Sequence, residues 1–247
     1  MNIKESIAIL PAVTYAVGDI HGCNDLLQTL LETIVEHRKT IEGKAKIIFL
    51  GDYIDRGPDA KEVLVTLWSR KLRRQFDEVI VLKGNHEAIL LESVERYERD
   101  KRDGVDLELL EERYRDTEKV YGMTRQTLRG FLKRLPIYHS DGIRLFTHAG
   151  IAPGIEIDSV SEEELLWYRG PVRDVKGRLV VHGHTPVLRK PKVTKYAVNI
   201  DTLAYGSSQL TCAVFIGKSR KPTFLWTQPD EEALLGIERA EAFAKNR

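Results

Sequence analysis

Chemically capable side chains stand directly after short apolar runs in several places along this chain. The best defined is the segment 51–57, Gly-Asp-Tyr-Ile-Asp-Arg-Gly, which follows the apolar run 47–50. Such a short run predicts a buried strand, and open α/β sheets place their active sites at the carboxyl ends of strands. A charge there is costly unless it is solvated, paired or metal-bound. We therefore predict that Asp52 binds metal, Asp55 orients a proton donor and Arg56 holds an anion.

Similar loops carry a larger set of candidate metal ligands. Imidazole and carboxylate groups without a thiolate are typical ligands of Mn²⁺, Fe or Zn²⁺ in catalytic sites, and not of a cysteine-rich structural zinc site. The set is too large for one ion, but it suits two ions about 3.5–4 Å apart that share a carboxylate. Its members are His21, His86, His148, His182 and His184, with Asp19, Asp52, Asp55 and Asn85.

The loops recur in a strand–loop–helix order, which is typical of a layered α/β protein. In the first half, strands are predicted at 12–17, 46–50 and 78–82, with a helix over 59–74 after the second strand. The second half is richer in strands, which are predicted at 143–147, 179–181, 193–200, 209–216 and 222–226.

Two further segments are predicted to be helical. The segment 93–134 is dense in charged residues with aromatic residues spaced through it. It is predicted either to form solvated helices with a few anchors or to form a cap over the site that helps to choose substrates. The segment 230–245 is predicted to be a helix that packs Leu234, Ile237 and Phe243 on the outside of the domain.

Composition excludes several classes of protein. The net charge of +1 gives no basis for a nucleic-acid or membrane-surface partner. No apolar run approaches the roughly 18–20 residues that span a bilayer, and residues 1–10 do not resemble a signal peptide. The two cysteines, Cys23 and Cys212, lie far apart and suit a reducing compartment. We expect a cytoplasmic protein.

Five motifs together resemble one known family. They are Gly-Asp-Ile-His-Gly at 18–22, the segment 51–57, Gly-Asn-His-Glu at 84–87, His-Ala-Gly at 148–150 and Gly-His-Thr-Pro at 183–186. The first three resemble the signature of the phosphoprotein phosphatase (PPP) family of calcineurin-like metallophosphoesterases, and the last two resemble later blocks of its bacterial and phage members. The resemblance covers about 12–211. It implies one domain over 1–247 with an α/β (α+β) fold, a four-layer αββα sandwich of two mixed sheets flanked by helices.

The resemblance also implies a metal-ligand set. Asp19, His21 and Asp52 would hold a first divalent ion, and Asp52, Asn85, His148 and His184 would hold a second. Two dications facing two carboxylates leave a net positive charge that attracts phosphate. They would also lower the pKa of a shared water, giving a hydroxide that attacks phosphorus directly. Mn²⁺ is the expected metal, with Fe or Zn²⁺ as alternatives. His182 and His184 compete for one ligand position, and the resemblance favours His184.

The catalytic roles follow from the same resemblance. His86 would protonate the leaving oxygen, and Asp55 would fix its tautomer and keep it charged. Arg56, Arg169 and Asn85 would bind the phosphate oxygens of the substrate. The attack would be in line, without a phosphoenzyme.

These motifs predict a metal-dependent phosphoric ester hydrolase, first of all a serine/threonine protein phosphatase. The alternative is a hydrolase of diadenosine tetraphosphate or related dinucleotides, which shares nearly all the motifs. An inactive scaffold that binds phosphoproteins is disfavoured because every expected ligand and the acid are present. The expected substrate is thus a phosphoprotein or a small phosphoester, and no regulatory subunit is inferred. The chain departs from its bacterial relatives at 203–206, where Leu-Ala-Tyr-Gly could narrow the site or stack on a substrate.

Overall fold

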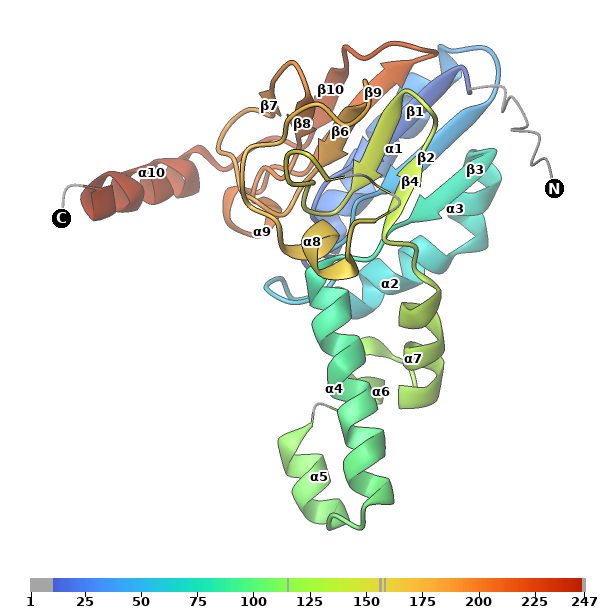
Figure 1. Ribbon diagram of the computed structural model, residues 1–247, viewed down its shortest axis with the longest axis vertical. Coiled ribbons are helices and arrows are strands. Elements are labelled where there is room, and N and C mark those ends of the chain that lie inside the picture. Colours follow the sequence, from blue (N-terminus) through green and yellow to red (C-terminus); the bar gives the residue numbers. More distant parts are fainter. Residues whose placement is uncertain (1–10, 115, 156, 158, 246–247) are drawn as a thin grey trace.

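The computed structural model describes residues 11–114, 116–155, 157 and 159–245, and two β-sheets form its centre (Figure 1). The first sheet has the strand order β10-β9-β1-β2-β3. β1, β2 and β3 are parallel, whereas β9 is antiparallel to both β1 and β10. The strands are β1 (Val13–Val17), β2 (Ala45–Phe49), β3 (Glu78–Val81), β9 (Thr211–Ile216) and β10 (Thr223–Trp226).

The second sheet has the order β4-β5-β6-β8-β7, and it is also mixed. β5, β6 and β8 run parallel, and β4 and β7 are antiparallel strands at the two edges. The strands are β4 (Tyr138–Ser140), β5 (Arg144–Thr147), β6 (Leu179–His182), β7 (Lys192–Val193) and β8 (Ala197–Asn199).

The main core lies between the two sheets. Ala16 and Ile48 from the first sheet meet Phe146 and Val181 from the second in one buried cluster. β1 and β2 are buried along their whole length, because one face of the first sheet contacts the second sheet and the other face contacts helices. Strands buried on both faces read as continuous apolar runs. The predicted fold of two mixed sheets flanked by helices is therefore confirmed.

Helices α1 (Asn24–Lys39), α2 (Ala60–Trp68) and α3 (Arg70–Gln75) cover the outer face of the first sheet. The prediction of one helix over 59–74 is wrong at Ser69. This residue has an extended backbone, and its side chain accepts a hydrogen bond from the Leu72 amide at the start of α3. A serine that caps the next helix in this way ends one helix and begins another.

Two predictions about the second sheet also need correction. The strand predicted at 193–200 is two antiparallel strands, β7 and β8, joined by a turn in which Thr194 Oγ1 accepts from the Ala197 amide. The edge strand β4 was not predicted. Its three residues are polar or aromatic and only partly buried, so they lack the apolar run that marks the other strands.

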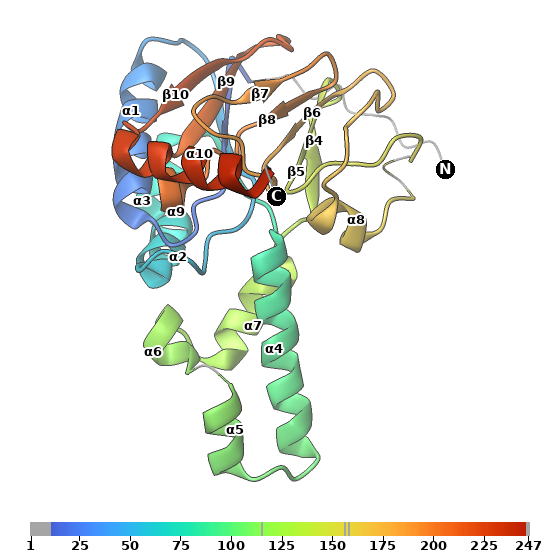
Figure 2. The ribbon, with the colours of Figure 1, turned by 90° about the vertical axis from the view of Figure 1, so that its left-hand side faces the viewer.

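Four helices extend away from the sheets as an arm in both views (Figures 1 and 2). They are α4 (Asn85–Arg102), α5 (Leu107–Arg113), α6 (Thr117–Tyr121) and α7 (Arg125–Arg134). Tyr97, Leu110 and Tyr114 form a small separate cluster in this arm, and Val105 packs against it. The segment 93–134 is thus largely helical, and a role as a cap over the site stays a prediction.

The remaining helices are short except for the last. They are α8 (Glu162–Trp167), α9 (Ala204–Ser207) and α10 (Glu231–Lys245). Leu234 of α10 is fully buried and Ile237 is partly buried, whereas the side chain of Phe243 lies outside the described residues. No helix in the described ranges is long and apolar enough to cross a membrane.

Candidate metal centre

The loops that follow β1, β2 and β3 meet the loops that follow β5 and β6 at one edge of the sandwich. His21, Asp52 and His184 all have a left-handed backbone conformation, with φ of 46°, 54° and 64°. Such conformations cost free energy for residues other than glycine and occur preferentially at functional sites. Gly51 lets the loops come together, because a Cβ there would lie 2.6 Å from the backbone of Gly84. The left-handed residues and Gly51 therefore let the backbones of these loops approach one another closely.

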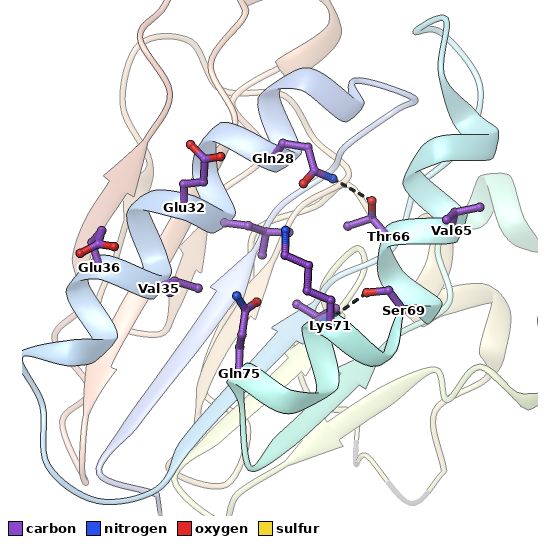
Figure 3. A pocket seen from close by; sticks show the side chains of 11 residues that line it. Gln28, Glu32, Val35, Glu36, Val65, Thr66, Ser69, Lys71 and Gln75 are labelled. Carbon is purple, nitrogen blue, oxygen red and sulfur yellow. Dashed lines mark hydrogen bonds between the residues drawn. The ribbon is translucent and has the colours of Figure 1, made fainter.

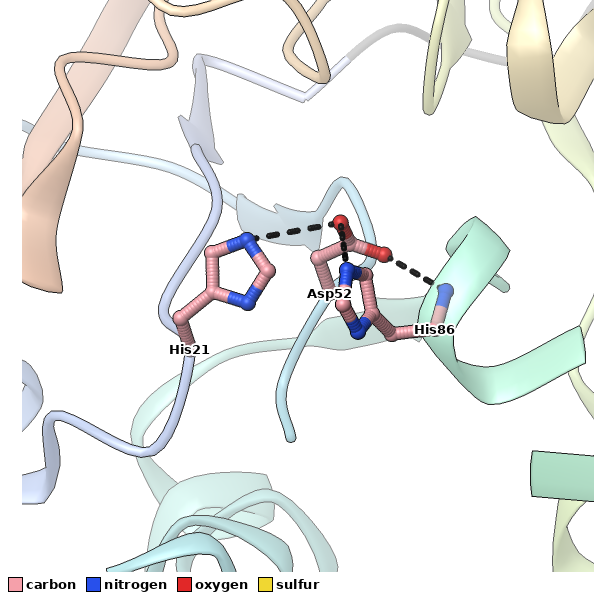
Figure 4. Close-up of side chains that lie close together, drawn as sticks. All are labelled: His21, Asp52 and His86. Carbon is pink, nitrogen blue, oxygen red and sulfur yellow. Dashed lines mark hydrogen bonds and ion pairs between the residues drawn. The ribbon is translucent and has the colours of Figure 1, made fainter. Parts of the chain in front are cut away.

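Asp52 is the centre of the site (Figure 4). Its Oδ2 lies 3.5 Å from His21 Nε2 and 4.0 Å from His86 Nε2. Its other oxygen, Oδ1, lies 3.4 Å from His148 Nε2 and accepts a hydrogen bond from the His86 amide at 3.1 Å. Asp52 is almost fully buried, and it therefore needs positive charge close to both oxygens.

Two groups of side chains have the spacing of metal ligands, and they share Asp52. One consists of His21, Asp52 and His86, and the other of Asp52, His148 and His184. Asn85 joins the second group, since its Oδ1 lies 2.8 Å from His148 Nε2 and 3.0 Å from His184 Nδ1. A carboxylate shared between two ligand groups is the arrangement expected of a bridge between two cations.

The orientation of the imidazoles supports the presence of cations. Nδ1 of His21 faces the carbonyl oxygen of Ile54 at 3.0 Å, and Nδ1 of His148 faces that of Leu50 at 3.1 Å. A carbonyl oxygen only accepts, so each Nδ1 carries the ring proton.

The other ring nitrogens are then left with lone pairs. Burial lowers the pKa of His21, and it lowers the pKa of His148 to about 3, so both rings are neutral and their Nε2 atoms are unprotonated. Both Nε2 lone pairs face oxygens of Asp52. His184 Nε2 is buried without a hydrogen-bond partner among the described residues. Lone pairs that face one another repel unless a cation lies between them. These residues therefore fit a pair of divalent ions.

Asp19 is placed differently from the other predicted ligands. Its carboxylate accepts from the backbone amide of His184, with distances of 3.0 Å to Oδ2 and 3.3 Å to Oδ1. Burial, and then the charges of Asp201 and Asp52, raise its pKa well above the usual value. The structure brings Asp19 to the site but not into either ligand group, where His86 lies beside His21 and Asp52 instead. A ligand role for Asp19 therefore stays a prediction.

His86 and Asp55 are paired as the sequence predicts. His86 Nδ1 lies 2.7 Å from Asp55 Oδ2, and this hydrogen bond raises the pKa of His86. This hydrogen bond through Nδ1 leaves Nε2 of His86 directed at the carboxylate of Asp52 (Figure 4). A histidine held in this way can carry a proton to an oxygen that leaves phosphorus.

The centre opens into a cavity of about 220 Å³. Its lining includes both predicted phosphate-binding arginines, Arg56 and Arg169, beside the candidate ligands. His182 is not in the lining, and its Nδ1 faces the neighbouring carbonyl of Gly183 at 3.1 Å. Of the two competing histidines, the structure thus places His184 at the cavity.

A second hollow of about 250 Å³ lies between α1 and the α2–α3 pair (Figure 3). Gln28 and Thr66 are hydrogen-bonded across it, and Val35 and Leu72 supply part of its apolar lining. It contains no histidine and neither of the ligand groups. The candidate metal ligands therefore lie at the cavity beside Asp52 and not at this hollow.

Three further residues support or line the site. Glu87 accepts hydrogen bonds from the amides of Asp52, Tyr53 and Gly84 at 2.8, 2.9 and 2.9 Å, and it thereby fixes the Asp52 loop to the start of α4. Its place three residues after Gly84 indicates helix capping in the sequence but not this link between loops. Asp201 and Tyr205 line the cavity.

Tyr205 belongs to the segment 203–206, which is expected from the sequence to be able to narrow the site, whereas Asp201 is harder to recognise from the sequence. Burial raises the pKa of Asp201 to about 7. Tyr205 stands edge-on to His21, with ring centroids 5.2 Å apart, and Arg56 lies over its ring at 5.6 Å. The only sequence clue to Asp201 is its position directly after an apolar strand, as for Asp19 and Asp52.

Comparison with known proteins identifies the class. Residues 13–207 match the calcineurin-like phosphoesterase family, and the chain belongs to that family. It is a metallophosphoesterase, that is, a hydrolase of phosphoric esters whose family uses divalent metal ions. The candidate ligand groups around Asp52 are consistent with this requirement.

Among curated relatives, two symmetrical bis(5'-nucleosyl)-tetraphosphatases illustrate the similarity. The one from Acidovorax sp. (strain JS42) is 30% identical over 236 residues, which cover 90% of this chain and 73% of the relative. The one from Pseudomonas syringae pv. syringae (strain B728a) is 33% identical over 141 residues, 56% of this chain and 42% of the relative. The chain thus aligns with less than half of the second relative.

Solved structures show the same fold at low sequence identity. A crystal structure described as a candidate diadenosine tetraphosphatase has a TM-score of 0.59 and 20% identity, and the match covers 88% of this chain and 93% of that one. A cold-active protein tyrosine phosphatase has a TM-score of 0.56 and 19% identity, with 90% and 80% covered. These similarities support the predicted fold and do not choose between substrates.

Proposed function

We propose that this protein hydrolyses dinucleoside tetraphosphates, with cleavage at the central phosphoanhydride. Water is added across that P–O bond, so diadenosine tetraphosphate would give two molecules of ADP. The observation that carries the chemistry is Asp52 shared between two ligand groups, with the His86–Asp55 pair beside it. The substrate class is supported by the relative that is 30% identical over 90% of the chain. This proposal takes the alternative predicted from the sequence in preference to a serine/threonine protein phosphatase.

The side chains around Asp52 would bind the metal ions in this reaction. Asp52, His21, His148, His184 and Asn85 would hold two divalent cations, with Asp19 as a further proposed ligand. The cations would supply positive charge for the phosphate oxygens and would activate water. We propose Mn²⁺ as the metal, as the sequence predicts.

The remaining site residues would bind the phosphates and transfer the proton. Arg56 and Arg169 line the same cavity and would bind phosphate oxygens as planar donors. His86 would donate its proton from Nε2 to the leaving phosphate oxygen, while Asp55 accepts from Nδ1 and holds the ring.

Two exposed aromatic rings at the centre support a substrate with two bases. Tyr205 is 41% exposed and contacts His21 of the first ligand group, whereas Trp167 is 44% exposed and its ring lies 6.1 Å from that of His184 in the second. A cavity of about 220 Å³ is too small for a whole dinucleotide, so the nucleosides must extend beyond it. Aromatic rings are platforms on which bases stack. One base on each ring would place the phosphates over the cations.

The test is a comparison of rates with Mn²⁺ supplied. Diadenosine tetraphosphate, a phosphoserine peptide and a phosphotyrosine peptide are given at equal concentrations, and the products are separated by anion-exchange chromatography. We expect ADP as the sole nucleotide product, at a kcat/KM at least about tenfold above either peptide. Formation of ATP with AMP, or faster release of phosphate from a peptide, would contradict the proposal. The Asp52→Asn variant, which is expected to lose metal, controls for contaminating hydrolases.

A further inference from the structure

β3 is an edge strand that the fold leaves open. It pairs with β2 on one side and ends the first sheet on the other. Within the described part of the chain, no hydrogen bond reaches the backbone of Glu78–Val81 from any element except β2. Val79, Ile80 and Val81 are only partly buried. An exposed edge of apolar residues is a template for pairing with another strand, and proteins usually protect such edges with lysine, proline or a covering element.

A groove of about 250 Å³ lies beside this edge. Val79 and Val81 contribute to it from β3, and Trp68 and Phe131 contribute from α2 and α7. The rings of Trp68 and Phe131 are stacked, with centroids 4.8 Å apart and planes at 28°. Trp68 remains 39% exposed, although it is large and apolar. The groove thus combines an open strand edge with a stacked aromatic pair.

The charged residues that line the groove are both positively charged. Arg73 of α3 and Arg134 of α7 line it, and no acidic residue does. Neither arginine forms an ion pair with another described residue, whereas Arg129 and Lys133 of α7 are both paired with Glu95. Two guanidinium groups at an apolar groove, without carboxylate partners, favour an acidic occupant.

We propose that this groove binds an extended acidic peptide segment of a partner protein, which adds a strand to the free edge of β3. Side chains of an added strand alternate between two faces. The face that meets the groove would therefore carry both kinds of contact. Apolar side chains in its middle would contact Val79, Val81 and the Trp68–Phe131 pair. Glutamate or aspartate side chains on the same face, toward the ends of the added strand, would reach Arg73 and Arg134, which line the same groove. The main chain of the peptide supplies affinity through hydrogen bonds, and the groove supplies selectivity. This docking surface is separate from the metal centre, because the two cavities share no lining residue.

The test uses a fluorescein-labelled heptapeptide of the sequence Glu-Ser-Val-Thr-Phe-Ser-Glu, in which the glutamate, valine and phenylalanine side chains share one face of an extended strand. The matched peptide has lysine in place of both glutamates. Fluorescence anisotropy should show saturable binding of the acidic peptide to the 247-residue chain. The double variant Arg73→Glu with Arg134→Glu should weaken that binding about tenfold or more and should bind the lysine peptide instead. Arg74→Glu is the matched control, because Arg74 is exposed on α3 but does not line the groove. The affinity of the Arg74→Glu variant for the acidic peptide should differ from that of the wild type by less than about threefold.

Two measurements distinguish strand addition from simple charge attraction. Amide hydrogen exchange on the wild-type protein should show new protection at Val79 and Val81 when the acidic peptide is bound. Hydrolysis of a small phosphoester should be unchanged in the double variant. The proposal is overturned if the acidic peptide does not saturate, if Arg74→Glu weakens binding as much as the double variant, or if the β3 amides gain no protection. A concentration-dependent dimer in light scattering that excludes the peptide would assign the edge to a second copy, and would also overturn it.

Discussion

At the scale of single residues, the site is governed by the burial of charge. Asp52 and Asp19 are almost fully buried, and Glu87 is fully buried with three backbone amides on its carboxylate. Burial raises the pKa of Glu87 to about 8. Burial lowers the pKa of His21, His148 and His184 beside these acids, so these rings are neutral and supply no compensating positive charge. Divalent cations bound at this cluster would supply the missing positive charge, which is the physical reason to expect a metal site here.

His86→Asn should keep the metal ions and lose turnover. General acid catalysis contributes about 10²–10⁴-fold, and the loss should be largest for substrates with a poor leaving group. We expect kcat for a phosphoserine peptide or another alkyl phosphate to fall by that factor, and kcat for p-nitrophenyl phosphate to fall much less. Equal losses on both substrates would contradict proton donation. Elemental analysis serves as the control that metal content is retained.

Tyr205→Ala and Trp167→Ala should each weaken the binding of a dinucleotide. Stacking of a base on an aromatic ring is worth about 1–3 kcal/mol, which corresponds to a rise in KM of roughly 5- to 150-fold. The KM of p-nitrophenyl phosphate should change far less in Trp167→Ala, since that substrate has no second ring to stack. Tyr205→Phe keeps the ring and is the matched control. If the KM for diadenosine tetraphosphate stays unchanged in both alanine variants, these rings do not bind the bases.

At the scale of elements, buried strands were predictable and their pairing was not. β1, β2 and β3 lie within one or two residues of their predicted bounds because each is a short run of apolar residues with one polar or charged residue among them. The half-polar strand β4 gives no such run and was missed. A break at Ser69 and a turn between β7 and β8 depend on side-chain hydrogen bonds to backbone amides. Periodicity does not report bonds of that kind.

The candidate site shows the same limit. Motif residues such as Asp52 and His148 are brought together as expected, because their loops follow parallel strands. The position of Asp19 depends on a hydrogen bond from the His184 amide, which lies far away in the sequence. Asp201 belongs to no motif that was recognised. Contacts of this kind follow from the way the two sheets stack, which no local pattern specifies.

His139 of β4 should make stability depend on pH. Its Nε2 accepts from Lys46 Nζ of β2 at 3.0 Å, and Glu78 of β3 and Asp141 are the acidic groups that face it. Burial, and then the charge of Lys46, lower the pKa of His139. The neutral ring is therefore the form that the folded state favours. Its contribution is fully present above the unfolded pKa of about 6.5 and is lost as the pH falls below that value.

The measurement is urea unfolding at about pH 7.5 and about pH 5.5. The free energy of unfolding should fall on acidification in the wild type, and it should fall less in His139→Phe, which removes the titrating group. His37→Phe does not serve as a matched control for His139→Phe, because it would also remove the hydrogen bond between His37 and the Tyr15 hydroxyl. The prediction fails if the wild type and His139→Phe lose the same free energy.

At the scale of the whole molecule, the metal centre joins the two sheets. His21 and Asp52 follow strands of the first sheet, whereas His148 and His184 follow strands of the second. Cations held between them would bind the folded protein and not the unfolded chain, so they would stabilise the fold by mass action. We therefore expect the stability of this protein to depend on its metal content.

Removal of metal by a chelator should lower the melting temperature. Free metal at 100 times its Kd contributes about 2.7 kcal/mol, which is roughly 5–10 °C for a chain of this size. Addition of Mn²⁺ should restore the melting temperature in the wild type and not in Asp52→Asn, and elemental analysis should find fewer than two ions in that variant. An unchanged melting temperature on chelation, with two ions lost, would refute the link between the sheets.

The position of β1 has a consequence for how the chain is made. Val13 pairs with Ala45 on one side and with Ile216 on the other. The side of β1 that pairs with β9 therefore stays unpaired during synthesis until residues 211–216 have left the ribosome. Pairings so distant in sequence form slowly, and unpaired strand edges on a growing chain are prone to aggregation. The open side of β1 therefore needs protection while the residues between β1 and β9 are made, and that interval includes all five strands of the second sheet.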